Sequence, residues 1–152
     1  MSFDERLALP GLGLSVVPKH VWTLAPLPPE VLREGLGVFL VHAATGINLN
    51  VRVLSAQPAL PVDDFPAASE RFFTHYWPGP RRMASFSTDA LREGVVAVFD
   101  AALPSIPDAI IREWFFSDGT RFVNAATYAT ERQWQERLLG DCEALLRSIQ
   151  IE

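Results

Sequence analysis

A hairpin signal near the carboxy terminus constrains the fold more than any other feature of the sequence. The dipeptide Asp-Gly at 118–119 separates two runs that are rich in aromatic and β-branched residues. Asp-Gly suits a two-residue type I′ turn, because both central positions of that turn take positive φ. We therefore predict a β-hairpin in which Phe115 pairs with Phe122 and Trp114 with Val123. Polar residues fall on both of its faces, so the pattern leaves open which face is buried.

The residues after the hairpin predict an amphipathic helix from about 131 to 147. Thr130 and Gln133 have the spacing of a capping box, in which each side chain accepts a hydrogen bond from the backbone of the other residue. Apolar residues then recur three and four positions apart, which places them on one side of the helix. They are Trp134, Leu138, Cys142, Leu145 and Ile149. Cys142 is the single cysteine, so an intrachain disulfide is excluded, and its position favours a buried apolar side chain over a reactive thiol.

Shorter elements are predicted earlier in the chain, where proline-rich connectors separate them. Strands joined by hairpins, with helices set apart in the sequence, are typical of α+β proteins. We expect one α+β domain spanning residues 1–152, built on a single antiparallel β-sheet of about six to seven strands with two main helices packed on it. The remaining elements are strands at 12–17, 38–43, 47–54, 83–87 and 95–100, and a helix over 65–77 that Asp63 and Asp64 cap and Pro78 ends.

Charge and composition exclude several classes of protein. Of the 152 residues, 49% are hydrophobic and 20% are charged, a balance that excludes a wholly disordered chain. The net charge of -5 argues against a nucleic-acid-binding protein, since such proteins present a basic surface to phosphates. The sequence has neither a secretion signal at its start nor a run of about 18 apolar residues. We therefore expect a cytoplasmic protein without stable insertion in a membrane.

No motif in the sequence indicates a catalytic, metal or cofactor site. His20, His42 and His75 fall in three separate elements and lack the close spacing of metal ligands. No serine occupies a Gly-x-Ser-x-Gly turn, and Gly11-Leu12-Gly13 lacks the further glycine and lysine of a phosphate-binding loop. We expect no cofactor, no metal and no catalytic residue. One alternative stays open, a small hydrolase in which His42 or His75 acts with a nearby carboxylate.

Aromatic and arginine side chains indicate two surfaces for a partner. The segment 76–82 combines an aromatic pair with an arginine pair around a rigid Pro-Gly-Pro turn, and such side chains are enriched at the centres of interfaces. The second surface is a face of the predicted hairpin. Ten phenylalanines and four tryptophans exceed what two helices would cover, so aromatic area remains for an apolar ligand or a peptide. The expected partner-binding residues are Tyr76, Trp77, Arg81, Arg82, Trp114 and Phe116.

Several stretches, taken in order, resemble one known superfamily. The early strand Gly-Leu-Ser-Val-Val at 13–17 is followed by Pro18 and Trp22, and a strand that alternates between polar and apolar residues lies at 48–53. The sequence Leu-Leu-Arg-Ser-Ile at 145–149 closes the last helix. With the middle helix and the late hairpin, this order resembles the PsbP-like fold superfamily, which includes the Ran-binding Mog proteins, the DcrB lipoproteins and the Eag-type chaperones of type VI secretion. The resemblance implies a binding module rather than an enzyme, and the Eag-type members hold hydrophobic effector segments on their sheet.

These observations lead to one main functional hypothesis and two alternatives. We expect a non-enzymatic, cytoplasmic, bacterial binding protein, a secretion-associated chaperone or adaptor that holds a polypeptide partner on its sheet. The first alternative is an immunity protein, whose acidic charge would suit a basic toxin. The second is the hydrolase described above. An open strand edge would also allow the chain to form a homodimer.

Overall fold

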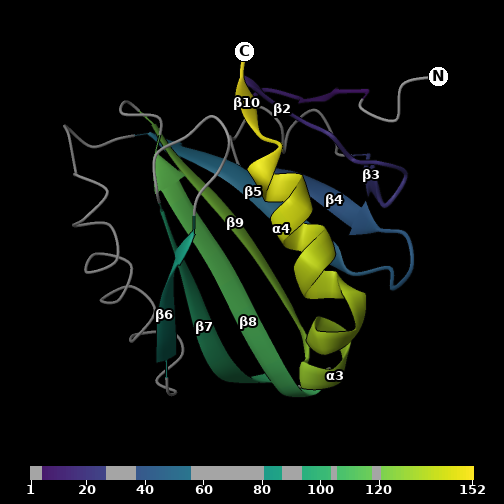
Figure 1. The fold of residues 1–152 in the computed structure, drawn as a ribbon, viewed down its shortest axis with the longest axis vertical. Helices are drawn as coiled ribbons and strands as arrows, with labels where there is room; N and C mark the ends of the chain where they lie inside the picture. The colour runs from purple at the N-terminus through teal and green to yellow at the C-terminus, as the bar shows by residue number, and fades with distance from the viewer. Residues whose placement is uncertain (1–4, 27–36, 56–80, 87–93, 104–105, 118–120) are drawn as a thin grey trace.

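In the part of the chain that the structure describes, the larger of two antiparallel sheets contains seven strands. The computed structural model describes residues 5–26, 37–55, 81–86, 94–103, 106–117 and 121–152, and the structural statements below concern these residues. The strand order is β3-β4-β5-β9-β8-β7-β6, which places β3 and β6 at the edges (Figure 1). The strands are β3 (Trp22–Leu24), β4 (Val38–His42), β5 (Asn48–Ser55), β6 (Arg81–Phe86), β7 (Gly94–Leu103), β8 (Ile106–Ser117) and β9 (Arg121–Thr130). The predicted antiparallel α+β architecture is confirmed for this sheet.

A second, three-stranded sheet joins the two ends of the described chain. It has the order β1-β2-β10, with β1 at Leu7–Leu9, β2 at Leu14–Val16 and β10 at Gln150–Ile151. The guanidinium of Arg6 donates hydrogen bonds to Ser15 and to the carbonyl oxygen of Ser148, which ties the sheet to the end of the helix. The prediction of a single sheet is therefore wrong in this part. A strand of two residues has no periodicity that a sequence pattern could detect.

One continuous helical segment follows β9 in the described residues. It consists of α3 (Glu131–Gln133), the π-helical turn η2 (Trp134–Leu138) and α4 (Leu139–Arg147). The capping box is confirmed, because the Gln133 amide donates to Thr130 Oγ1 at 3.3 Å and the Thr130 amide donates to Gln133 Oε1 at 3.0 Å. The other predicted helix, over 65–77 with its cap at Asp63 and Asp64, lies outside the described residues. No helix in the described part of the chain has the length and apolar character needed to cross a bilayer.

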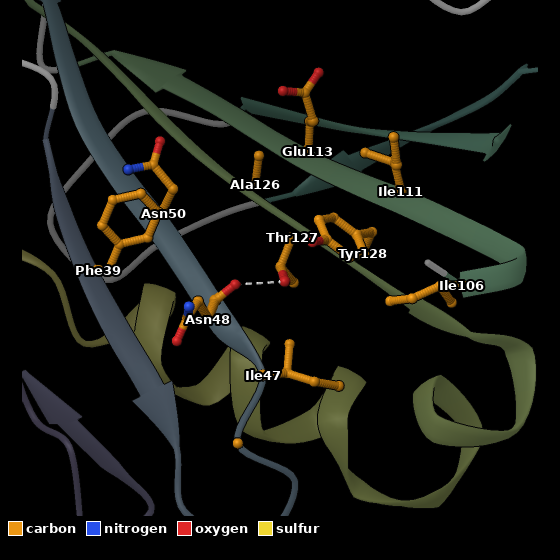
Figure 2. A pocket seen from close by; sticks show the side chains of 11 residues that line it. Phe39, Ile47, Asn48, Asn50, Ile106, Ile111, Glu113, Ala126, Thr127 and Tyr128 are labelled. Carbon is orange, nitrogen blue, oxygen red and sulfur yellow. Dashed lines mark hydrogen bonds between the residues drawn. The ribbon is translucent and has the colours of Figure 1, made fainter. Parts of the chain in front are cut away.

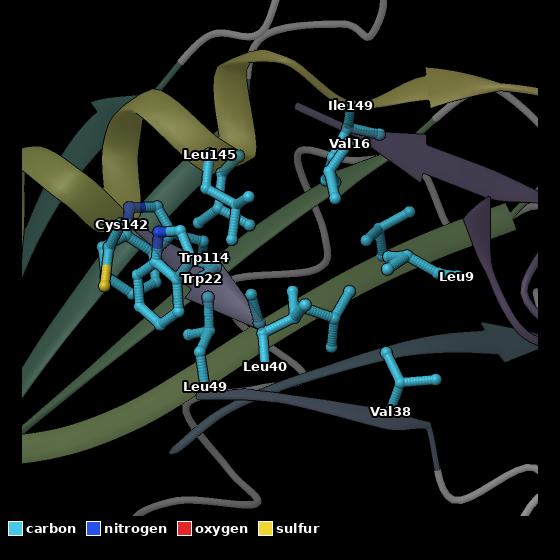
Figure 3. Close-up of a cluster of buried hydrophobic side chains, with 14 of the residues drawn as sticks. Leu9, Val16, Trp22, Val38, Leu40, Leu49, Trp114, Cys142, Leu145 and Ile149 are labelled. Atoms are coloured by element: carbon cyan, nitrogen blue, oxygen red, sulfur yellow. The ribbon is translucent and has the colours of Figure 1, made fainter. Parts of the chain in front are cut away.

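The helical segment covers one face of the large sheet and closes the core there (Figure 1). The predicted apolar stripe is confirmed, since every one of its members is at most 2% exposed. Figure 3 shows Cys142 and Leu145 against Trp22 and Trp114 of the sheet, with which they form one cluster. The rings of Trp114 and Trp134 have centroids 6.1 Å apart. Burial, together with the neighbouring carboxylates, raises the pKa of the Cys142 thiol, which favours the inert thiol predicted from the sequence.

The late hairpin forms, but its register differs from the predicted one. Phe115 pairs with Asn124 instead of Phe122, and Trp114 pairs with Ala125 instead of Val123. The pairing is shifted by two positions, so the predicted register is wrong, and the predicted turn at Asp118-Gly119 lies outside the described residues. A shift of two preserves the face of every side chain. The observed register sets the large Trp114 ring beside a small alanine, and packing of this kind outweighs local turn propensity.

Candidate ligand-binding site

Four neighbouring strands bring a row of side chains together on the face of the large sheet opposite the helix. Phe39 of β4 pairs with Asn50 of β5, Asn50 pairs with Ala126 of β9, and Ala126 pairs with Glu113 of β8. The next residue along β8, Trp114, belongs to the core under the helix. Successive side chains in a strand point to opposite faces, so the row points away from that core. Ala126, the third residue of the row, has only a methyl group as its side chain, and this leaves a hollow between Asn50 and Glu113.

A cavity with a volume of about 490 Å³ lies over this hollow (Figure 2). Cavities of this size hold small ligands or a few side chains. The next row of the sheet contributes Ile111 of β8 and its partner Tyr128 of β9. Tyr128 is 44% exposed, so its ring lies at the rim and is accessible to a ligand. The apolar wall of the cavity is made by Phe39, Ile47, Ile106, Ile111, Ala126 and Tyr128.

Glu113 is the acidic residue among the described residues that line the cavity. Its residue exposure is only 3%, and its Oε2 atom is buried without a hydrogen-bond partner among the described residues. Burial raises the pKa of this carboxyl group to about 8, against the opposing effects of the Arg52 charge and a hydrogen bond with Asn124. At neutral pH the group is therefore mostly protonated. A protonated carboxyl group offers one O–H donor as well as acceptor capacity.

Asn124 holds the Glu113 carboxyl group from the neighbouring strand. Its Oδ1 atom accepts a hydrogen bond of 2.9 Å from Nε of Arg52, which fixes the orientation of the side-chain amide. The amide nitrogen then donates to the carbonyl oxygen of Trp114 at 3.3 Å and faces the carboxyl group of Glu113. Asn124 itself is 1% exposed. The acidic group is therefore positioned by a buried hydrogen-bond chain that reaches from β5 across β9 to β8.

Other polar groups of the cavity are partly engaged in the sheet. The amide nitrogen of Asn50 donates to the carbonyl oxygen of Val38 at 3.2 Å. The hydroxyl of Thr127 donates to the carbonyl oxygen of Asn48 at 2.6 Å, as the dashed line in Figure 2 marks. These bonds hold β4, β5 and β9 together beneath the cavity. They also make the wall a mixture of apolar surface and oriented polar groups, the mixture typical of binding sites for small ligands.

The structure corrects the expectation for two predicted partner-binding residues. Trp114 is 0% exposed and Phe116 is 1% exposed, and both belong to the core under the helix. A partner could not contact them without opening that core. Glu113 and Tyr128 were not among the predicted site residues, because the sequence pattern leaves open which face of the hairpin is buried. The available signal was an acidic residue, Glu113, placed directly before the aromatic run 114–116 of β8.

The remaining predicted partner-binding residues stay predictions. Tyr76 and Trp77 lie outside the described residues. Arg81 and Arg82 begin β6, an edge strand, where they pair with Phe99 and Val98 of β7. The described backbone places these two arginines three strands away from Ala126 of β9.

Among the described histidines, His42 has both a hydroxyl and a carboxylate as neighbours. Its ring is 0% exposed, with Nδ1 2.8 Å from Oγ1 of Thr45 and Nε2 2.7 Å from Oδ2 of Asp141. The ring also packs against Trp22, with centroids 4.9 Å apart. His20 is exposed in the turn before β3, and His75 lies outside the described residues. Within the described part of the chain, no three metal-binding side chains cluster.

Comparison with known proteins connects this architecture to one fold. No family model and no curated protein matches the sequence. The structure is similar to the solution structure of cyanobacterial PsbP (CyanoP) from Synechocystis sp. PCC 6803, with a TM-score of 0.67, 11% sequence identity, and coverage of 97% of this chain and 92% of that one. The fold is PsbP-like. The resemblance predicted from the sequence is thus confirmed at the level of the fold.

A second solved structure has the same arrangement within a longer chain. It is a crystal structure from Bacteroides thetaiotaomicron VPI-5482, with a TM-score of 0.64 and 6% sequence identity. The match covers 99% of this chain but 49% of that chain. At such low identity the likeness shows the PsbP-like fold alone, and the function of this chain has to be argued from its own side chains.

Proposed function

We propose that this chain is a non-enzymatic binding protein that holds a segment of a polypeptide partner in the cavity on its sheet face. The observation that carries this proposal is the cavity beside Glu113, where an apolar wall surrounds oriented polar groups. Apolar surface supplies affinity, and a few fixed polar groups select the ligand. The secretion-associated chaperone or adaptor expected from the sequence would bind its client through this cavity.

A polypeptide fits the chemistry of the cavity wall. The wall presents amide side chains and a protonated carboxyl group, and both kinds of group form hydrogen bonds with peptide groups without a net charge. The exposed ring of Tyr128 at the rim adds apolar contact area of a type that is enriched at protein interfaces. An apolar side chain of the partner would enter between Phe39 and Ile111, above Ala126.

Filling the cavity tests the proposal. Ala126→Leu adds three methylene-sized groups to the floor of the cavity, and Ala144→Leu adds the same atoms to the exposed surface of α4. Peptides enriched from a displayed random library by the wild-type protein should bind Ala126→Leu at least about tenfold more weakly. The same peptides should bind Ala144→Leu as they bind the wild type. If wild type and Ala126→Leu enrich the same peptides with equal affinity, the cavity is not the binding site.

A hydrolase is the second candidate, because His42 has the neighbours that such an enzyme needs. A hydroxyl, an imidazole and a carboxylate in hydrogen-bonding order can activate an oxygen nucleophile. The complete burial of the His42 ring makes this candidate the weaker one, since a substrate would reach only Thr45. If the candidate is correct, Thr45→Val should abolish ester hydrolysis that the wild type catalyses. Equal hydrolysis of p-nitrophenyl acetate by wild type and variant would exclude it.

A further inference from the structure

The carboxyl group of Glu113 gives the cavity a specific hydrogen-bonding pattern. One of its oxygens, Oε2, is buried without a hydrogen-bond partner among the described residues, while Asn124 holds the group from β9. Buried polar atoms are almost always hydrogen-bonded, so an oxygen of this kind in a cavity wall is available to pair with a group that enters the cavity. Figure 2 shows Glu113 and Ile111 rising from β8 on the same side as Asn50 of β5, around Ala126.

We propose that the cavity selects an uncharged carboxamide next to an apolar group, and that this carboxamide pairs with Glu113. In a polypeptide partner, an asparagine or glutamine beside an apolar residue would supply such a group. The inference rests on the proposed binding function and specifies its ligand.

Pairing with a carboxamide satisfies both sides of the interaction. The protonated carboxyl group donates its O–H to the carbonyl oxygen of the ligand, and the ligand N–H₂ donates to a carboxyl oxygen. Two parallel hydrogen bonds of this kind bury no net charge. The orientation is fixed in advance, because Asn124 holds the carboxyl group by a hydrogen bond and is itself held by Arg52.

Charged ligands fit the same wall less well. A ligand ammonium group would require ionised Glu113, and burial works against ionisation. A ligand carboxylate would bring an uncompensated charge against Phe39, Ile111 and Ile106, and transfer of a charge to such surroundings is costly. Arg52, the cation whose charge acts on Glu113, already donates to Asn124.

Three probes that differ only in their polar group test the inference. They are 3-phenylpropanamide, 3-phenylpropanoate and 3-phenylpropylamine, each titrated into the full chain at neutral pH by isothermal calorimetry. The amide should bind at least about tenfold more tightly than either charged probe. Glu113→Gln keeps a donor and an acceptor, so its affinity for the amide should stay within about threefold of wild type. Glu113→Leu removes both groups and should lose about tenfold or more.

A pH series provides a measurement that does not depend on how well the leucine variant folds. Raising the pH from about 6.5 to about 9.5 crosses the pKa of Glu113, so binding of the amide to wild type should weaken, while binding to Glu113→Gln should not. Arg52 is the charged group that acts on Glu113, and Tyr128 is the other titratable group in the described wall. Wild type and Glu113→Gln share both of these residues, so the difference between the two proteins isolates Glu113.

The outcomes separate the ligand chemistry from the proposed function. No binding of any probe, equal binding of all three, or unchanged amide binding to Glu113→Leu would overturn the carboxamide assignment. If the amide probe binds as expected but displayed peptides bind wild type and Ala126→Leu with equal affinity, the proposal of a polypeptide partner fails. The assignment of a carboxamide ligand is then still supported. If peptides require the open cavity but show no preference for asparagine or glutamine, the binding function stands and the carboxamide assignment fails.

Discussion

Nε2 of His42 lies 2.7 Å from Oδ2 of Asp141, although the two residues are 99 positions apart in the sequence. His42 ends β4 and Asp141 lies in α4, so this contact attaches one end of the large sheet to the helix that covers it. Trp22 of β3 strengthens the attachment, because its Nε1 donates to the carbonyl oxygen of Asp141 at 3.3 Å. We interpret the contact as a structural link between the β3–β4 end of the sheet and the helix.

Removing the carboxylate of this link should destabilise the protein. Asp141→Ala leaves the buried His42 ring without its acceptor, and we expect a loss of about 1–3 kcal/mol in the free energy of unfolding. Glu143→Ala is the matched control on the same helix, because it removes only an exposed ion pair with Arg147 and should cost less than about 1 kcal/mol. Urea unfolding followed by circular dichroism measures both. Equal losses for the two variants would show that the contact between His42 and Asp141 contributes no more to stability than an exposed ion pair.

The buried carboxyl group of Glu113 should make stability depend on pH in an unusual direction. Its pKa is about 8 in the folded state and 4.5 without the fold, so the folded state binds the proton more tightly. The contribution of this group is therefore fully present below about pH 4.5 and is lost as the pH rises toward 8. The side chain of the Glu113→Gln variant cannot lose a proton. The free energy of unfolding of the wild type should therefore decrease relative to that of this variant as the pH rises from about 4.5 to about 8. Urea unfolding at a series of pH values gives the difference, and parallel curves would contradict the prediction.

Substitution of an aromatic residue should affect stability in β8 and ligand binding in β9. Trp114→Ala removes a fully buried ring and should cost about 3–5 kcal/mol. Tyr128→Ala removes a ring that is 44% exposed at the cavity rim and should change stability by less than about 0.5 kcal/mol while it weakens ligand binding. Thermal unfolding and calorimetry with 3-phenylpropanamide test the pair. A stable Trp114→Ala protein with impaired binding would instead restore the sequence-based expectation for Trp114.

The thiol of Cys142 should resist modification while the protein is folded. It has no exposed surface, and burial with nearby carboxylates keeps it protonated. Iodoacetamide should label it in denaturing urea but not under native conditions, as intact-mass spectrometry would detect. Rapid labelling of the native protein would mean that the helix opens easily from the sheet.

Local patterns predicted those parts of the fold that depend on neighbouring residues. The capping box at Thr130 and the apolar stripe of the last helix follow from spacing along the chain, and both are confirmed. The register of the late hairpin could not be predicted in the same way. It depends on whether Trp114 packs beside alanine or valine, which is a property of the assembled core.

The candidate site depends on contacts that sequence patterns do not contain. Asn50, Ala126 and Glu113 come from three strands and form one row only after β5, β9 and β8 have paired. The residues predicted to bind a partner were aromatic residues and arginines, and of these Trp114 and Phe116 lie in the core. The candidate cavity is instead centred on a small residue, Ala126. The hollow above Ala126 cannot be predicted from the sequence, because it depends on which residues of β5 and β8 pair with Ala126.

The pairing of β10 with β2 has a consequence for synthesis in the cell. Gln150 lies opposite Ser15, and the backbone amide of Glu152 donates to the carbonyl oxygen of Gly13 at 3.0 Å. A ribosome releases these late residues long after the early strand has emerged, so β2 must wait with an unpaired edge while the rest of the chain is translated. Completion of the small sheet therefore has to wait until residues 150–151 have been synthesised, and a nascent chain that stalls before residue 150 leaves this edge open to other polypeptides.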